Sequence, residues 1–426
     1  YLELMQKEGE YLDINDEVDW NLEMGAICRL ADETLSPSPI FNKVKESPGF
    51  RAAEWGFTKS GTRGRPWCRV APNVGAPLDA TLMEIQQAYI HSLENNPVHP
   101  PKIVDAKDAP CKENKWVGDE IDLFKLPVPL QHAHDAERML QSAGVNICRT
   151  PDGRWTNWSI NRSAVHDKNT MKGYWIPTSQ HNGMIWKQWL EKGEDMPFAI
   201  AFGVPPVCAW QSASRVPDYV DEYDVASQML NAPIEMVKCE TNDLMVPATS
   251  EIVVEGYVSV TETLMEGPYG EHAGYHFEHK VLPKPKQVVT CVTFRNNAIL
   301  PTAVPAVTPN STVIGIAVCN SADVVIAIKK QGFPVIDGHA TIESSGSWFV
   351  LRVKNNWHKT TGWSLDELRS VQDWYVRYGL LAAEGISEAM ERLRALRAAQ
   401  EPIGGYTENG GAMRIGADRA SVERKA

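Results

Sequence analysis

The densest group of residues that could carry chemistry is the stretch 265–275, which reads MEGPYGEHAGY. Its glycines and proline predict a tight turn after a strand, and such a turn can bring Glu266 and Glu271 toward one pocket. Neighbouring carboxylates disfavour each other's ionisation, so one of such a pair can hold a proton near neutral pH and act as an acid. The pattern indicates proton transfer, although a hairpin with two solvated acids would have the same sequence.

Histidines follow the second glutamate closely. His272, His276 and His279, together with Glu278, could form a metal site, but the spacing lacks the helical context of a zinc motif. Gly274 and the aromatic residues beside it predict a strand instead, on which these side chains would alternate between two faces. A zinc hydrolase is therefore the weaker alternative.

A second polar group lies at residues 155–162, which read WTNWSINR. On a strand, alternation would place Asn157, Ser159 and Asn161 on one face, and Arg162 on the other face or at the strand end. An arginine there could bind a carboxylate through two parallel hydrogen bonds, which suits an acidic substrate. The alternative is a surface arginine on an edge strand.

The composition is that of an ordinary globular protein. Of the 426 residues, 43% are hydrophobic and 23% are charged, and this length and balance predict two or three domains with a sizeable core. The formal net charge of -12 repels nucleic-acid phosphates and anionic lipid, so neither is an expected partner. Patterns of a hydrolase nucleophile, a phosphate-binding loop or a dinucleotide fold do not occur.

The cysteines and the N-terminal sequence indicate a cellular location. Eight cysteines without C-x-x-C spacing predict reduced, intracellular thiols. No run approaches the roughly 18 apolar residues that span a bilayer, and Glu3, Glu8 and Glu10 stand where a signal peptide would be basic. We therefore expect a soluble, cytoplasmic protein without a membrane partner.

Hydrophobic periodicity predicts the elements that must position these residues. Apolar residues at helical spacing, glycine stops and runs of β-branched residues mark both kinds of element. The expected helices cover residues 16–33, 182–192, 223–230, 322–330 and 384–399, and the expected strands cover 252–261, 287–294, 333–336 and 348–353. The Gly-rich end, 404–426, is expected to be loose.

The order of these elements predicts an α+β protein with three parts. A proline-rich stretch at 97–101, followed by the charged segment 105–115, marks a boundary near residue 110. The parts are an N-terminal α/β region over 1–110, a mostly β middle domain over 111–305, and a C-terminal α/β domain over 306–426. The last part ends in an amphipathic helix of the kind that docks on another subunit.

Seven sequence words, taken together, resemble the UbiD family of decarboxylases, and most of all its ferulic and cinnamic acid branch. They are PCKEN at 110–114, LPVPL at 126–130, WTNWSI at 155–160, FGVPP at 202–206, KCETNDL at 238–244, VPATSE at 246–251 and EGPYGE at 266–271. The words occur in the order of the family, and the resemblance runs from about residue 10 to about residue 365. Words as long as KCETNDL are too specific for chance.

The resemblance implies a UbiD-like fold in which the middle domain is a split β-barrel that binds prenylated FMN, and the C-terminal domain forms the oligomer. It implies that Asn157, His181 and Glu222 ligate a divalent ion, Mn²⁺ or Mg²⁺, which bridges the cofactor phosphate, with K⁺ nearby. The other residues implied to contact the cofactor are Ser159, Ile160, Arg162, Gln180 and Lys359.

The implied reaction is the reversible, non-oxidative decarboxylation of an aromatic or α,β-unsaturated acid, with the flavin as electron sink. Arg162 would orient the carboxylate and act with Glu266 and Glu271, and Glu271 would deliver the proton that replaces CO₂. The implied partners are the acid, CO₂ and a flavin prenyltransferase that supplies the cofactor, and the implied assembly is a homodimer or larger homo-oligomer. A non-catalytic flavin-binding or assembly subunit of the family is the alternative.

Two features depart from the family pattern. His272 and Ala273 follow the Gly-Pro turn where the family commonly has other residues, which bears on the substrate pocket. Beyond about residue 368, the acidic word and the long C-terminal portion of the family do not occur. A different pocket wall would weaken the activity or broaden its specificity.

Overall fold

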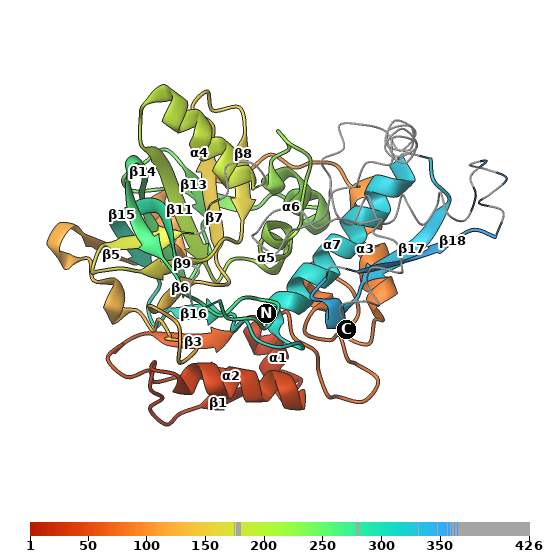
Figure 1. The fold of residues 1–426 in the computed structure, drawn as a ribbon, viewed down its shortest axis with the longest axis horizontal. Helices are drawn as coiled ribbons and strands as arrows, with labels where there is room; N and C mark the ends of the chain where they lie inside the picture. The colour runs from red at the N-terminus through yellow and green to blue at the C-terminus, as the bar shows by residue number, and fades with distance from the viewer. Residues whose placement is uncertain are drawn as a thin grey trace, which may run out of the picture. The chain divides into compact units, whose positions relative to one another are not determined.

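The computed structural model describes residues 1–364 apart from 174, 176–179, 278–280, 331, 347, 356, 358, 360, 361 and 363. It divides into two compact units, a first of Tyr1–Asp323 with Ala340–Gly346 and a second that begins at Val324. Both helices and strands are present in the first unit (Figure 1). The domain limits near 110 and 305 stay predictions.

The largest sheet of the described chain has nine strands, and each of its pairings is antiparallel. The strand order is β6-β9-β10-β15-β14-β11-β7-β8, and β5 also pairs with β15. The strands are β5 (Asn114–Val117), β6 (Met139–Gln141), β7 (Val145–Arg149), β8 (Thr156–Ser159), β9 (Ser163–Val165), β10 (Thr170–Gly173), β11 (Met196–Phe202), β14 (Ile252–Glu266) and β15 (Leu282–Phe294).

Strands β14 and β15 form a long hairpin at the centre of this sheet. Their runs of Val, Ile and Thr favour extended backbone, and the pairing runs from Ile252 opposite Phe294 to Glu266 opposite Leu282. The predicted strands 252–261 and 287–294 are confirmed. Both extend further because each strand satisfies the backbone groups of the other beyond the β-branched runs.

The core beneath the sheet is built from the inward side chains of several strands and one helix. Phe198, Ile200, Val254 and Val292 belong to this cluster, and Ile185 of helix α4 packs with them. This buried layer fixes which face each strand residue takes.

A smaller sheet is formed mainly by the N-terminal residues and has the order β1-β2-β3-β16. Its strands are β1 (Tyr11–Ile14), β2 (Ser38–Phe41), β3 (Arg51–Glu54) and β16 (Ile299–Thr302). Helix α2 (Glu23–Thr34) contributes Met24 and Cys28 to a cluster with Phe41 of β2. The chain therefore returns to its N-terminal sheet after completing the large one.

The helix predicted over 16–33 is wrong at its start, because α2 begins only at Glu23. The preceding residues have hydrogen-bond partners elsewhere. The amide of Val18 donates to the carbonyl of Lys43, and the amide of Leu22 donates to that of Leu130. Leu22 also has a φ of 70°, which a continuing right-handed helix does not allow.

Helices α4 (His181–Lys192) and α6 (Glu222–Leu230) confirm the predictions over 182–192 and 223–230. The other helices of this region are α1 (Leu2–Lys7), α3 (Leu82–Asn95) and α5 (Pro206–Ala213), and a small sheet contains β4 (Lys102–Ile103), β12 (Glu235–Lys238) and β13 (Met245–Pro247). Short 3₁₀ helices cover Ala71–Val74, Ala106–Asp108, Pro110–Lys112, Gly118–Glu120, Leu123–Lys125 and Ile342–Ser344.

Helix α7 (Ser311–Lys330) contains the predicted helix 322–330 but starts much earlier. Its length and mean hydropathy of 1.8 are those of a helix able to cross a membrane, which the sequence reasoning overlooked. Of its most apolar window, 72% is buried inside the protein, as in the core helix of a globular domain.

Strands β17 (Val335–Ala340) and β18 (Phe349–Val353) pair with each other. The strand predicted at 333–336 starts later, because the amide of Phe333 still bonds the carbonyl of Ile328 at the helix end. The predicted strand 348–353 is confirmed to within one residue. The predicted helix 384–399 and the end 404–426 lie outside the described residues.

Gly256 of β14 offers a test of this fold. It lies where the β14–β15 register shifts, and a Cβ there would be 1.9 Å from the carbonyl oxygen of Val288. We expect Gly256→Ala to lower the free energy of unfolding by about 3 kcal/mol, because overpacking against a backbone atom forces the strands apart. Urea denaturation measures this, with Thr263→Ala at an exposed position of the same strand as the control. Equal stability of the two variants would contradict the close approach.

Candidate functional site

Arg162 forms hydrogen bonds with both glutamates of the Gly-Pro turn. Its Nε donates to Glu266 Oε1 over 2.7 Å, and its Nη2 donates to Glu266 Oε2 over 3.3 Å. Its Nη1 donates to Glu271 Oε2 over 3.1 Å. The structure therefore brings together the three residues that the sequence indicated, with a two-bonded fork on one glutamate and a further bond to the other.

The sheet and the turn position these three side chains. Arg162 lies between β8 and β9, and Glu266 is the last residue of β14. Strands β10 and β15 lie between β9 and β14 in the sheet. After Glu266, Gly267 has a φ of 96° and precedes a cis peptide bond to Pro268. Glycine suits that backbone, and the chain then turns back toward Arg162 with Glu271.

Burial differs between the two glutamates. The side chain of Glu266 is 2% exposed, whereas those of Glu271 and Arg162 are 18% and 20% exposed. Burial lowers the pKa of Arg162, but the hydrogen bond and charge of Glu266 and the charge of Glu271 outweigh it and raise that pKa. The Arg162 guanidinium also lies 5.3 Å from the ring centre of Tyr269. It is a fixed cation between two acids.

The strand predicted around Gly274 is wrong. The amide of Glu271 donates to the carbonyl of Tyr275, and the amide of Gly274 donates back to the carbonyl of Glu271. These bonds close a turn. Gly274 within it has a φ of 82°, a backbone conformation that glycine adopts readily. Among the described residues of this segment, an isolated bridge between Gly270 and His276 is the one feature that resembles strand pairing. Aromatic residues suggested strand here, but the local turn bonds decide the backbone.

The described residues give the zinc alternative no site. Among them, no group of three or more His, Cys, Asp or Glu is arranged to hold a metal ion. His276 Nε2 lies 3.1 Å from the backbone oxygen of His134. Glu278 and His279 lie outside the described residues.

A second polar cluster contains Asn157, His181 and Glu222. Asn157 Nδ2 donates to Glu222 Oε1 over 2.8 Å, and the Trp158 amide donates to Glu222 Oε2 over 2.7 Å. His181 Nδ1 lies 3.8 Å from Glu222 Oε1, and His181 Nε2 lies 3.0 Å from Asp218 Oδ1. Asn157 belongs to β8, while His181 and Glu222 are the first residues of α4 and α6.

This cluster has the donor types that a divalent ion beside an anionic group would need. Within the described chain, Asn157 Oδ1 and Ser159 Oγ are buried without a hydrogen-bond partner. Glu222 is buried, and burial raises its pKa despite the nearby His181 and the hydrogen bond from the Trp158 amide. A carboxylate, an amide oxygen and an imidazole suit Mn²⁺ or Mg²⁺, and the positive N-terminal ends of two helices suit a phosphate.

The remaining predicted cofactor residues occupy different places. Ser159 ends β8, Ile160 follows it, and both are half-buried. Gln180 is the N-cap residue of α4, next to His181. Lys359 is exposed and belongs to the second unit. The first three therefore lie close in sequence to the Asn157 cluster, and the place of Lys359 beside the cofactor stays a prediction.

Sequence reasoning missed the residues that bind the turn between the two glutamates. Asp135 Oδ1 accepts a hydrogen bond from the Gly270 amide over 2.8 Å. Glu137 Oε2 accepts one from the Tyr269 hydroxyl, also over 2.8 Å. The acid-rich word HDAE at 134–137 was the available signal. A single sequence does not reveal that this word meets a turn more than 130 residues later.

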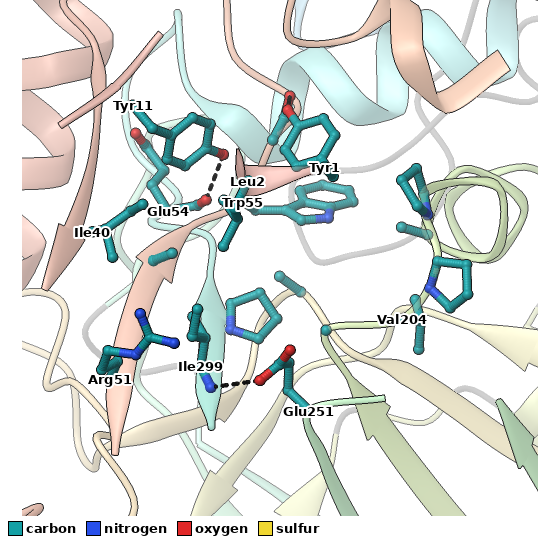
Figure 2. Close-up of a pocket in the computed structure, with 18 of the residues that line it drawn as sticks. Tyr1, Leu2, Tyr11, Ile40, Arg51, Glu54, Trp55, Val204, Glu251 and Ile299 are labelled. Carbon is teal, nitrogen blue, oxygen red and sulfur yellow. Dashed lines mark hydrogen bonds between the residues drawn. The ribbon is translucent and has the colours of Figure 1, made fainter. Parts of the chain in front are cut away.

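A cavity of about 660 Å³ lies elsewhere in the first unit, lined by residues that include Glu54, Trp55 and Val204 (Figure 2). None of the predicted site residues is among its described lining. Of its acids, Glu251 accepts from Ile299 N–H and pairs with Arg295, whereas both side-chain oxygens of Glu54 are buried without a hydrogen-bond partner in the described chain. Because none of the predicted site residues lines the cavity, it does not bear on the placement of the Arg162 site.

Two sequence models of one family match the chain. The N-terminal domain of 3-octaprenyl-4-hydroxybenzoate carboxy-lyase, UbiD_N, matches residues 2–57, and the Rift-related domain of the same enzyme, UbiD, matches residues 102–308. The second match contains both polar clusters.

Curated relatives and solved structures agree with this match. Ferulic acid decarboxylase 1 of Saccharomyces cerevisiae is 36% identical over 368 residues, 83% of this chain and 71% of that protein. Pyrrole-2-carboxylic acid decarboxylase of Pseudomonas aeruginosa is 34% identical, over 83% and 70%. An evolved dimeric form of the UbiD-class enzyme HmfF from Pelotomaculum thermopropionicum, in complex with prFMN, has a TM-score of 0.73 and 28% identity, over 84% of this chain and 80% of that chain.

A further structural match shows the fold alone. The closed form of vanillic acid decarboxylase from Sedimentibacter hydroxybenzoicus has a TM-score of 0.80 at 19% identity, over 97% of this chain and 89% of that chain. The family models and the curated relatives define a carboxy-lyase. The chain belongs to the UbiD family, as the seven sequence words indicated.

Removal of Arg162 tests the site as a structural unit. We expect Arg162→Ala to lower the free energy of unfolding by about 3 kcal/mol, because it leaves Glu266 buried without its cation. Urea denaturation at neutral pH measures the loss. The control is Arg154→Ala, which removes an arginine that is 79% exposed and paired with Asp152, and it should change stability little. Equal effects would show that Glu266 does not depend on Arg162.

Proposed function

We propose that this chain is a prenylated-FMN-dependent decarboxylase that removes CO₂, without net oxidation, from an aromatic or α,β-unsaturated acid. The observation that carries the proposal is one guanidinium, Arg162, bound to the two carboxylates Glu266 and Glu271 in a member of a carboxy-lyase family. Relatives named for ferulic and pyrrole-2-carboxylic acids, and a similar structure with prFMN, support it.

Arg162 is the group that would bind the substrate carboxylate. Its guanidinium already faces two acids, so a third carboxylate would leave the cluster with excess negative charge. That excess favours protonation of one glutamate. Binding of the acid and loading of the proton donor would thus be linked by charge alone.

We assign the proton to Glu271 and the permanent charge to Glu266. Glu266 has the two-bonded fork and is 2% exposed, whereas Glu271 is 18% exposed. After CO₂ leaves, Glu271 would give its proton to the carbon and take another from solvent. Glu266 would stay ionised and keep Arg162 in place.

The cofactor, when bound, supplies an electron sink for the carbanion character left by CO₂. Asn157, His181 and Glu222 would hold a divalent ion with the cofactor phosphate, at the N-termini of α4 and α6. Ser159, Ile160, Gln180 and Lys359 are the further proposed contacts. A nearby K⁺ rests on the family resemblance.

The assembly and supply of the enzyme are also proposals. A homodimer or larger homo-oligomer, a flavin prenyltransferase as source of the cofactor, and a cytoplasmic location all follow the family resemblance. A dimeric form of a similar enzyme supports the first of these. The substrate would be a small carboxylic acid, and high CO₂ would drive the reverse reaction.

The proton-donor assignment predicts the behaviour of Glu271→Gln. Co-expression with a flavin prenyltransferase should give a protein with the cofactor's absorbance, and CO₂ release from cinnamic and hydroxybenzoic acids measures turnover. We expect Glu271→Gln to bind the cofactor and to lose about 10²- to 10⁴-fold in turnover, the usual contribution of a general acid.

The matched control is Glu262→Gln, an exposed glutamate on β14, which should turn over like the unaltered protein. Unchanged turnover in Glu271→Gln would overturn the assignment. An unaltered protein that takes up the cofactor but releases no CO₂ would instead be the non-catalytic subunit. A colourless protein would exclude both.

The metal assignment predicts loss of Mn²⁺ binding. With FMN present, we expect Asn157→Ala and Glu222→Gln to weaken Mn²⁺ binding at least about tenfold, since even outer-shell changes cost this much. Electron paramagnetic resonance of free Mn²⁺ measures the affinity. Asp224→Asn, on the same helix as Glu222, is the control. Unaltered affinity in both site variants would place the ion elsewhere.

A further inference from the structure

Each residue of the 135–137 segment binds one residue of the turn that joins Glu266 to Glu271. The pairs are the Gly270 amide with Asp135 Oδ1 over 2.8 Å, the Ala136 amide with the Pro268 carbonyl over 2.9 Å, and the Tyr269 hydroxyl with Glu137 Oε2 over 2.8 Å. Three consecutive residues therefore cover the inner part of the turn, between the two acids of the site.

Asp135 is a buried anion with several donors. Its side chain is 1% exposed, and besides Gly270 it accepts bonds from the amide and Nδ1 of His132 over 3.0 and 2.9 Å. His132 Nε2 faces the carbonyl of Pro305. Burial lowers the pKa of His132, but the hydrogen bond and charge of Asp135 and the Pro305 carbonyl outweigh it and raise that pKa. A Cβ at Gly270 would lie 2.7 Å from this ring.

Glu137 links the other half of the turn to the sheet. Its Oε1 lies 2.7 Å from Lys172 Nζ, in a lysine whose side chain is 7% exposed. Lys172 Nζ also donates to the carbonyl of Met265, the residue before Glu266. Through Lys172 and Tyr269, Glu137 thus fixes the backbone on both sides of Glu266. The ring of Tyr269 lies beside the Arg162 guanidinium.

The turn needs support from outside itself. It carries two carboxylates that repel each other, and Arg162 attracts their ends but does not fix the backbone that bears them. A side chain at the end of a flexible turn can move by an ångström, and such a shift can cost about 10²-fold in rate. The 135–137 segment lies where that movement would begin.

We propose that Asp135 and Glu137 are positioning residues that fix the backbone of the Gly-Pro turn, and with it the placement of Glu266 and Glu271 around Arg162. Neither residue needs to touch substrate or cofactor in this role. The effect of these two residues on the reaction rate rests on the proposed function, whereas their effect on the backbone of the Gly-Pro turn does not.

Amide exchange in the protein without cofactor tests the structural half. Hydrogen–deuterium exchange of peptides that cover 266–275 should speed up in Asp135→Ala, since the Gly270 amide loses its acceptor. Asp135→Asn retains an acceptor oxygen and should restore most of the protection. The control is Asp119→Ala, an exposed acid in the same unit, and peptides outside the turn report whether the fold survives.

Turnover of the cofactor-loaded enzyme tests the catalytic half. We expect Asp135→Ala and Glu137→Ala to lower kcat by roughly 10- to 100-fold, with little change in KM or cofactor absorbance, and we expect Asp135→Asn to recover much of the loss. The pH profile of kcat should shift in the alanine variants, because the two acids no longer sit as before around Arg162.

Two results would overturn the proposal or part of it. Unchanged exchange of the turn peptides in Asp135→Ala would show that the segment does not fix the turn. Faster exchange with unchanged kcat would show that the fixed turn is irrelevant to chemistry. If Asp135→Ala unfolds, Glu137→Ala, which removes the acceptor of the Tyr269 hydroxyl, carries the same test. If the unaltered enzyme shows no turnover, only the proposed function is contradicted, because the exchange experiment on the protein without cofactor does not depend on turnover.

Discussion

An ionised carboxylate in a buried place is stabilised by a cation within hydrogen-bonding distance, and Glu266 has that cation in Arg162. The two residues are 104 positions apart, so their meeting depends on the register of the nine-stranded sheet. A one-residue slip of β14 against β15 would turn the Glu266 side chain to the other face. The register shift at Gly256, where no Cβ fits against Val288, is therefore part of what places the site.

A single stretch of chain connects the two polar clusters. Asn157 lies in β8, and Arg162 comes five residues later, a distance of at most about 17 Å for an extended chain. Pairing of Asn157 with Cys148 of β7 holds this stretch in the sheet. Under the proposed function, one strand thus sets the spacing between the phosphate end of a cofactor and the residues at its reacting end. That explains why the polar residues of 155–162 occur so close together.

Elements and turns that depend on nearby residues could be predicted from the sequence. Those that depend on contacts between distant segments could not. The β-branched runs of β14 and β15 and the turn after Glu266 could be foreseen from residue types alone. The start of α2 could not, because the amides of Val18 and Leu22 bond to the carbonyls of Lys43 and Leu130, which lie outside the helix. The turn around Gly274 was mistaken for a strand, since aromatic content is a weaker constraint than its two turn bonds. The role of Asp135 could not be predicted, because its partner Gly270 is 135 residues away in the sequence.

Glu266 and Glu271 lie in different structural environments, and these environments suit different chemical roles. Glu266 pairs with Leu282 at the end of a strand ladder, so its backbone position is fixed. Its side chain is shielded from water. Glu271 lies beyond the turn, where its side chain reaches water. A permanent counter-ion for Arg162 needs the first setting, because movement or hydration would weaken the pair. A proton donor that must recharge from solvent needs the second. Under the proposed function, one residue cannot satisfy both needs, which gives a physical reason for two acids on either side of a Gly-Pro turn that holds them around one arginine.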